Sequence, residues 1–186
     1  MQDMLRPPQD RDPYAEVLAK PYADAGELAL IEALLGRPSK ARAAVAVRCA
    51  NGLPAVLRCD PYDLDGNPFP TMFWLCAPLA ASRIGGLEST GVMSDLTDAV
   101  REDTEFGRHN REATARFLAL RDRLPGGPIP GNPTQGGMPD RVKCLHSLYA
   151  HYLATGDNPV GEWAHQQLAP VPCHAECVRA DQEPQA

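Results

Sequence analysis

Apolar residues recur at helical spacing early in the chain. In the segment DAGELALIEALL, Leu28, Ile31, Leu34 and Leu35 repeat at i, i+3, i+6 and i+7, a spacing that places side chains on one face of an α-helix. Asp24 precedes this pattern as a candidate N-cap, and Gly36 follows it as the glycine that commonly ends a helix. The pattern therefore predicts a helix over residues 24–35.

Short runs of β-forming residues come next. Two of them, AAVAVRC and LPAVLRC, flank Asn51-Gly52, a dipeptide that is the strongest local signal for a hairpin turn. A third apolar run, TMFWLC over residues 71–76, follows a segment rich in turn-forming residues. Three strands with short connections predict an antiparallel meander, because parallel strands need long crossovers.

The rest of the chain has helical spacing. Glycine and proline divide it into helices, which are predicted over residues 78–90, 94–101, 104–124, 139–154 and 161–168. Ser94 and Asp103 are the expected N-caps of the second and third of these helices. Strands followed by helices are typical of the α+β class. We therefore predict a small antiparallel meander of about three strands, followed by and packed against several helices.

The length and composition indicate one globular domain. The chain has 186 residues, of which 44% are hydrophobic and 23% charged, as is usual for a single globular domain. We expect a flexible lead-in over residues 1–13, a single α+β domain over residues 14–170 and a poorly ordered tail over residues 171–186.

The charge and the absence of targeting patterns limit the partners. A formal net charge of -6 gives no general attraction to nucleic acids or anionic membranes, so neither is expected as a partner. No apolar run approaches the roughly 18 residues of a membrane span, and the polar start lacks the apolar core of a secretory signal. These features predict a cytoplasmic protein whose six cysteines are reduced thiols.

The run GGMPDRVKCLH is the most informative segment. It completes a long glycine- and proline-rich loop over residues 125–139, and loops of this length are often functional. Gly136 and Gly137 permit close approach of a ligand. The helix predicted to start at Pro139 offers free N–H groups to an anion.

Charged residues follow these glycines, and Arg141 is the one best suited to bind a carboxylate or phosphate bidentately. We predict a ligand site at the junction over residues 136–146, with the binding residues Gly136, Gly137, Asp140, Arg141 and Lys143. The alternative is a glycine loop that only leads into a capped helix, with its charges solvated.

His146 is the expected general acid or base, because histidine titrates near neutral pH. A metal site is not predicted. Cys144 and His146 are two residues apart and would point to nearly opposite sides of a helix. Cys173 and Cys177 flank His174 but lack a second pair of ligands at zinc-binding spacing. We therefore expect no metal and no other cofactor.

Three longer strings carry a family resemblance: GRPSKARAAVAVRC, DGNPFPTMFWLCAP and GGMPDRVKCLHSLYAHYLATGDNPVG. Together they resemble an actinobacterial family, the domain of unknown function 501, over about residues 34–165. The resemblance implies gene neighbours that encode the septum formation initiator protein and an exopolyphosphatase, and it implies no particular activity. The family often has Cys-Pro-Cys-Gly where this chain has Cys49-Ala50-Asn51-Gly52, so this chain lacks one thiol for a family-wide metal or redox site.

Two functions from different classes follow. The first is a binding protein or enzyme for a small anionic, phosphorylated ligand at the 136–146 junction, with His146 moving a proton. The second is a non-catalytic partner in cell division or envelope growth, which only the implied gene neighbours suggest. A concave, positively charged pocket would favour the first function, and a broad exposed apolar patch would favour the second.

Overall fold

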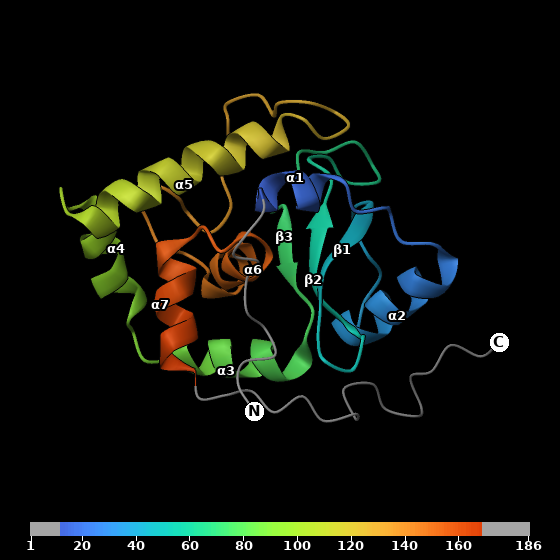
Figure 1. The fold of residues 1–186 in the computed structure, drawn as a ribbon, viewed down its shortest axis with the longest axis horizontal. Coiled ribbons are helices and arrows are strands. Elements are labelled where there is room, and N and C mark those ends of the chain that lie inside the picture. The colour runs from blue at the N-terminus through green and yellow to red at the C-terminus, as the bar shows by residue number, and fades with distance from the viewer. Residues whose placement is uncertain (1–11, 169–186) are drawn as a thin grey trace.

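The computed structural model describes residues 12–168. In this range the chain forms three strands and seven helices, in the order α1 (Pro13–Leu18), α2 (Ala25–Leu35), β1 (Ala43–Arg48), β2 (Pro54–Cys59), β3 (Phe73–Leu75), α3 (Pro78–Glu88), α4 (Met93–Arg101), α5 (Glu105–Arg121), α6 (Leu145–Thr155) and α7 (Pro159–Gln167). Figure 1 shows the predicted α+β arrangement, to which α1 is an addition. None of the helices in residues 12–168 is long and apolar enough to cross a membrane. The predicted tail, and the predicted lead-in up to residue 11, lie outside the described residues.

The strands form one antiparallel sheet in the order β1-β2-β3, which confirms the predicted meander. Val45 pairs with Leu57, and Val56 pairs with Leu75. Gly52 lies in the turn between β1 and β2 with a φ of 79°. Glycine adopts this left-handed conformation without steric cost, so the hairpin forms where the Asn-Gly pair predicts it.

The two faces of the sheet bury different apolar clusters. Adjacent residues of a strand point to opposite faces, so Val56 and Leu57 of β2 join different clusters. Ile31 and Leu35 of α2 pack in the cluster of Leu57. Leu148 of α6 packs in the cluster of Val56. The sheet therefore lies between α2 and α6.

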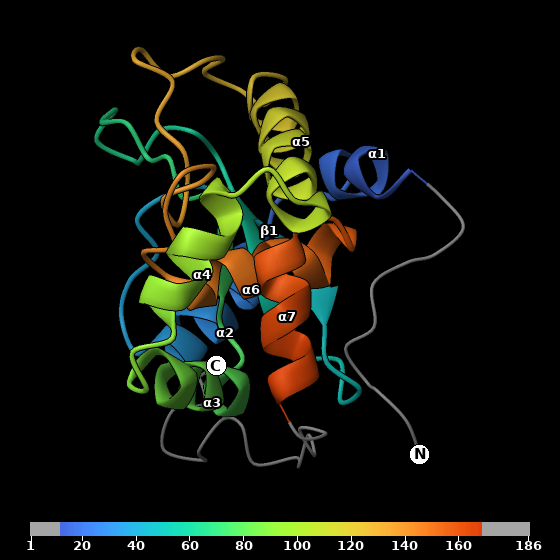
Figure 2. The same ribbon diagram turned by 90° about the vertical axis from the view of Figure 1, so that its left-hand side faces the viewer.

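The central helix of the fold is α6. All of its residues except His146 are buried, and it packs against β3, α7, α3 and α1. Figure 2 shows it behind α7, near the middle of the molecule. Burying one large apolar side chain such as Leu148 stabilises a fold by about 1.5–3 kcal/mol. Polar groups on this helix are therefore held in a well-packed frame.

The caps of α4 and α5 differ from the predicted ones. The N–H of Ser94 bonds to the Gly91 carbonyl at 3.2 Å, so Ser94 already lies within a turn and cannot begin the helix. The hydroxyl of Thr104 accepts the Gly107 N–H at 3.2 Å and caps α5. Asp103 lies one position too early for this contact.

The helix predicted over residues 139–154 begins only at Leu145. The preceding segment bonds back to the glycine loop: the Arg141 N–H donates to the Gly137 carbonyl at 2.9 Å, and the Lys143 N–H donates to the Gly136 carbonyl at 2.7 Å. These donors are used in a compact turn and are not free to enter a helix. The predicted boundary was wrong, and the N-terminus of α6 lies next to Cys144.

Candidate functional site

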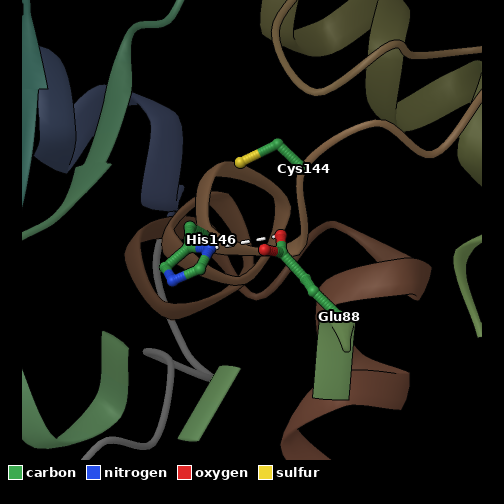
Figure 3. Close-up of side chains that lie close together, drawn as sticks. All are labelled: Glu88, Cys144 and His146. Atoms are coloured by element: carbon green, nitrogen blue, oxygen red, sulfur yellow. Dashed lines mark ion pairs between the residues drawn. The ribbon is translucent and has the colours of Figure 1, made fainter. Parts of the chain in front are cut away.

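Three polar side chains converge where α6 begins. Glu88 at the end of α3, Cys144 just before α6 and His146 in its first turn each place a polar atom within 4.8 Å of the other two (Figure 3). We call these three residues the thiol cluster. Cys144 has extended backbone angles, φ -155° and ψ 106°, so its side chain does not follow the helical register. The expectation that Cys144 and His146 point to opposite sides assumed one helix containing both, and it was wrong.

The carboxylate of Glu88 joins α3 to the start of α6. Its Oε1 accepts a hydrogen bond from the Leu145 N–H at 2.6 Å and lies 3.1 Å from His146 Nδ1. The first N–H groups of a helix lack intrahelical acceptors and form the positive end of its dipole. An anionic group therefore does lie at the start of this helix, and it is a side chain of the same chain.

His146 is held through both of its ring nitrogens. Nε2 lies 3.0 Å from the Ala81 carbonyl, which can only accept, so Nε2 carries a hydrogen. Nδ1 faces the Glu88 carboxylate, which also accepts. Hydrogen bonding with Cys144, opposed by burial and assisted by Glu88, raises the pKa of His146 to about 9. His146 is therefore an imidazolium at neutral pH.

The thiol of Cys144 also lies close to the imidazolium of His146. Burial by itself raises the pKa of its thiol, but hydrogen bonding with His146 and with Ser147 outweighs burial and lowers the pKa. A charged histidine and a helix N-terminus are the surroundings that activate thiols. In contrast, burial raises the pKa of Cys59 and of Cys76 to about 12. Of these three cysteines, only Cys144 has the surroundings of a reactive thiolate.

The thiol cluster is open to solvent. The side chains of His146 and Glu88 are 33% and 23% exposed. Gly85 and Gly86 occupy the neighbouring turn of α3. A Cβ at Gly85 would lie 3.9 Å from His146 Cε1, whereas a Cβ at Gly86 would meet nothing within 4 Å. Glycine inside a helix lowers its stability by about 1 kcal/mol relative to alanine. The pair Gly85-Gly86 therefore weakens α3, but it leaves the His146 ring without a covering side chain at these two positions.

The thiol cluster lies in the part of the chain that matches a known family. The model of the family described as Protein of unknown function (DUF501) matches residues 45–166. The chain belongs to the DUF501 family. No curated protein and no solved structure matches it significantly. The family's description names no activity, so the chemistry of the site is the guide to function.

In this DUF501 chain, the two predicted ligand-binding glycines are surrounded by the chain itself. Gly136 and Gly137 have φ angles of 61° and 92°, which favour glycine. A Cβ at Gly136 would lie 2.7 Å from Leu148 Cδ2, and a Cβ at Gly137 would lie 2.8 Å from the Arg141 carbonyl oxygen. In the structure these glycines let the loop pack against α6 and against itself.

The predicted charged residues of the junction lie on the surface. Asp140, Arg141 and Lys143 are exposed, and the Asp140 carbonyl accepts a hydrogen bond from Arg101 Nε at 2.9 Å. Across residues 12–168, the side chains of Arg141 and Lys143 form no ion pair. Of the predicted site residues, only His146 is part of the thiol cluster.

Cys144 and Glu88 are the members that sequence reasoning missed. The predicted helix start at Pro139 places Cys144 inside the helix, on nearly the opposite side from His146. A helix that starts at Leu145 removes that objection, because Cys144 then lies outside the helical register. Glu88 has no local signal, since only the packing of α3 against α6 brings it to the cluster.

A second polar network surrounds His151, further along α6. Asn158 Oδ1 accepts the Gly161 N–H at 2.8 Å, so Asn158 Nδ2 is the group that donates to His151 Nδ1 at 3.1 Å. His151 Nε2 then donates to the Tyr14 hydroxyl at 3.1 Å, and Tyr14 donates to Asp157 at 2.7 Å. We call His151 and its partners Asn158, Tyr14 and Asp157 the His151 network.

The ring of His151 is fully buried. It stacks on Phe73 with the ring centroids 5.1 Å apart. Burial lowers the pKa of His151 to about 3, so the ring is neutral, as the hydrogen-bond directions also require. Both of its nitrogens are satisfied within the protein. The His151 network therefore connects α1, α6 and the start of α7, and its role is structural.

Proposed function

We propose that this DUF501 protein is an enzyme whose nucleophile is the Cys144 thiolate and whose substrate is a small anionic molecule bound at the 136–146 loop–helix junction. The observation that carries the proposal is the convergence of the thiol cluster at the solvent-accessible start of α6. A thiolate next to a charged histidine is the arrangement of cysteine nucleophiles in acyl transfer.

Each member of the cluster has its own role. Cys144 Sγ adds to a carbonyl carbon of the substrate, and the bond from that carbon to the leaving group breaks with its electron pair. The Nδ1 proton of His146 passes to the leaving group, and His146 then takes a proton from the water that hydrolyses the thioester. Glu88 is a positioning residue, because it holds the ring and favours its charged form.

The anionic character of the substrate is inferred from the charges beside the cluster. Arg141 and Lys143 are exposed and form no ion pair within the described residues, and Lys143 directly precedes Cys144. Arginine binds a carboxylate or phosphate bidentately, and lysine adds a point charge. These side chains support the small, phosphorylated or carboxylated ligand that the sequence suggests.

The surface gives less support to a non-catalytic partner in cell division or envelope growth. Such a partner would be expected to have a broad exposed apolar patch. Among the large apolar side chains of residues 12–168, only Leu28 and Leu64 are exposed, at 36% and 67%. They belong to α2 and to the loop between β2 and β3, so the described part of the chain offers no broad apolar patch in favour of this second function.

Alkylation with iodoacetamide tests the nucleophile. The folded full chain is treated in the presence of a chelator, and the modified cysteines are mapped by mass spectrometry. We expect Cys144 to react well before Cys59 and Cys76, which serve as buried controls in the same chain. His146→Gln should slow the reaction at pH 7 about tenfold, because without the imidazolium the pKa of Cys144 rises and less thiolate is present. If Cys144 reacts no faster than the buried thiols, the proposal is wrong.

p-Nitrophenyl acetate tests the acyl-transfer step. The thiolate should displace p-nitrophenolate and form an acetyl thioester, which gives a burst of colour and an acetyl group on Cys144 by mass spectrometry. Cys144→Ser should abolish both. An alkylatable Cys144 that accepts no acetyl group would leave the nucleophile in place and exclude acyl transfer.

A further inference from the structure

We propose that the thiol cluster also binds a divalent transition-metal ion of the zinc class, and that the bound ion blocks the Cys144 thiolate. The blocking rests on the proposed function, whereas the metal binding does not. Thiolate sulfur, imidazole nitrogen and carboxylate oxygen are the protein ligands of Zn²⁺. The thiol cluster offers one ligand atom of each type.

The three donor atoms are close enough to share one ion. They lie within 4.8 Å of one another, and the ligands of tetrahedral zinc lie about 3.5 Å apart when each is about 2.0–2.3 Å from the ion. Glu88 Oε1 is bonded to the Leu145 N–H, which leaves Oε2 for a metal. Binding an ion therefore requires the partly exposed Cys144 and Glu88 side chains to rotate towards it.

The orientation of His146 is the one that a metal ligand needs. Its Nε2–H donates to the Ala81 carbonyl at 3.0 Å, and such a second contact fixes the ring of a metal-bound histidine. Nδ1 is then the nitrogen that faces the other two ligands. A metal ion bound there takes the place of the Nδ1 proton that faces Glu88, since metal ligands must be deprotonated.

Solvent access completes the argument. Three protein ligands leave one position of a tetrahedral ion for water, as in catalytic zinc sites. The exposure of His146 and Glu88, at 33% and 23%, and the bare turn at Gly85 and Gly86 give an ion and its water a path to the cluster. When an ion is bound, the sulfur lone pair of Cys144 coordinates it and is no longer available to attack a substrate.

Cobalt(II) is the probe, because it takes zinc sites and absorbs visible light. The full chain, reduced and freed of metal with a chelator that is then removed, is titrated with Co²⁺. We expect a thiolate-to-cobalt charge-transfer band and the visible bands of a tetrahedral ion, both displaced by Zn²⁺. Cys144→Ala should abolish the charge-transfer band, and His146→Gln and Glu88→Gln should each weaken Co²⁺ binding about tenfold or more.

The matched control lies in the same chain. The segment CHAEC contains Cys173, His174 and Cys177 and offers the same ligand types. Cys173→Ser/Cys177→Ser should leave the cobalt spectrum unchanged. If this variant loses the charge-transfer band while Cys144→Ala keeps it, the ion binds elsewhere and the proposal is overturned. A complete lack of cobalt bands in the wild-type chain also overturns it.

Alkylation of Cys144 separates the two proposals. Zn²⁺ should slow the reaction of Cys144 with iodoacetamide at least tenfold, and EDTA should restore it. If Cys144 is reactive but the chain shows no cobalt bands, the result supports the thiolate enzyme and contradicts the metal site. If the cobalt bands depend on Cys144 but Cys144 is unreactive in the metal-free chain, the result supports the metal site and contradicts the thiolate enzyme. Binding of Zn²⁺ without any slowing of alkylation refutes the blocking.

Discussion

His146 and His151 lie on the same helix and differ in almost every physical respect. His146 is partly exposed, contacts a carboxylate and a thiol, and has a pKa raised to about 9. His151 is fully buried, stacks on Phe73 and has a pKa lowered to about 3. One ring is charged and reachable, and the other is neutral and enclosed.

The difference comes from what each ring faces and not from the helix that carries it. The acceptors around His146 stabilise a charged ring. Around His151, one partner donates and the other accepts, and the apolar surroundings disfavour charge. A histidine suited to catalysis needs the first environment, whereas a histidine that holds helices together needs the second. The following predictions test this contrast from the largest effect to the smallest.

Replacing each histidine by alanine should affect stability very differently. His151→Ala removes a buried ring from its stack on Phe73 and leaves one hydrogen of Asn158 Nδ2 without its acceptor, so we expect a loss of about 3 kcal/mol in the free energy of unfolding. His146→Ala removes a partly exposed ring and, at pH 9, where its charge no longer stabilises the fold, should cost about 1 kcal/mol or less. Urea unfolding of the two variants measures both values. Equal losses would contradict the division into a structural and a functional histidine.

The two rings should also give stability opposite dependences on pH. An unfolded histidine has a pKa of about 6.5. The folded pKa of His151 is about 3, so below pH 6.5 the unfolded chain binds a proton that the folded chain does not, and stability falls as the pH falls. From pH 7 to pH 5 this single group accounts for about 2 kcal/mol. The folded pKa of His146 is about 9, so its contribution is complete below pH 6.5 and is lost as the pH rises towards 9.

Urea unfolding at pH 5, 7 and 9, with a chelator present, separates these contributions. His151→Gln should flatten the dependence between pH 5 and 7. His146→Gln should remove the loss of stability that His146 causes between pH 7 and 9, a loss that the lowered pKa of Cys144 opposes in the wild-type chain. Each variant is the control for the other. If His151→Gln changed the dependence between pH 7 and 9, or His146→Gln that between pH 5 and 7, the assigned charge states would be wrong.

The contrast also shows which features the sequence can reveal. Helix α2 and the hairpin around Gly52 are determined by interactions between residues close together in the sequence, so local patterns predict them well. The start of α6 depends on contacts outside the helix, because Arg141 and Lys143 bond to the glycine loop. Helical spacing continues through that segment and gives no sign of the break.

The thiol cluster depends on distant contacts to an even greater extent. His146 could be chosen from the sequence because histidine chemistry is recognisable in itself. Cys144 could be placed correctly only with the true helix start, and Glu88 only with the packing of α3 on α6. Of the three residues of the thiol cluster, the sequence therefore indicates only His146. Cys144 and Glu88 are recognised as members only from the tertiary structure.

The smallest predicted effect concerns two adjacent glycines of α3. Gly85→Ala and Gly86→Ala should each stabilise the helix by about 0.5–1 kcal/mol, because alanine has the higher helix propensity. Only the methyl group at position 85 would contact His146, at 3.9 Å from Cε1. Gly85→Ala should therefore slow the reaction of Cys144 with a bulky disulfide reagent such as dithionitrobenzoate a few-fold, while Gly86→Ala leaves the rate unchanged. Thermal unfolding and the release of thionitrobenzoate measure the two effects. If both variants gain stability and react at the wild-type rate, the bare turn of α3 does not serve as the approach to the thiol cluster.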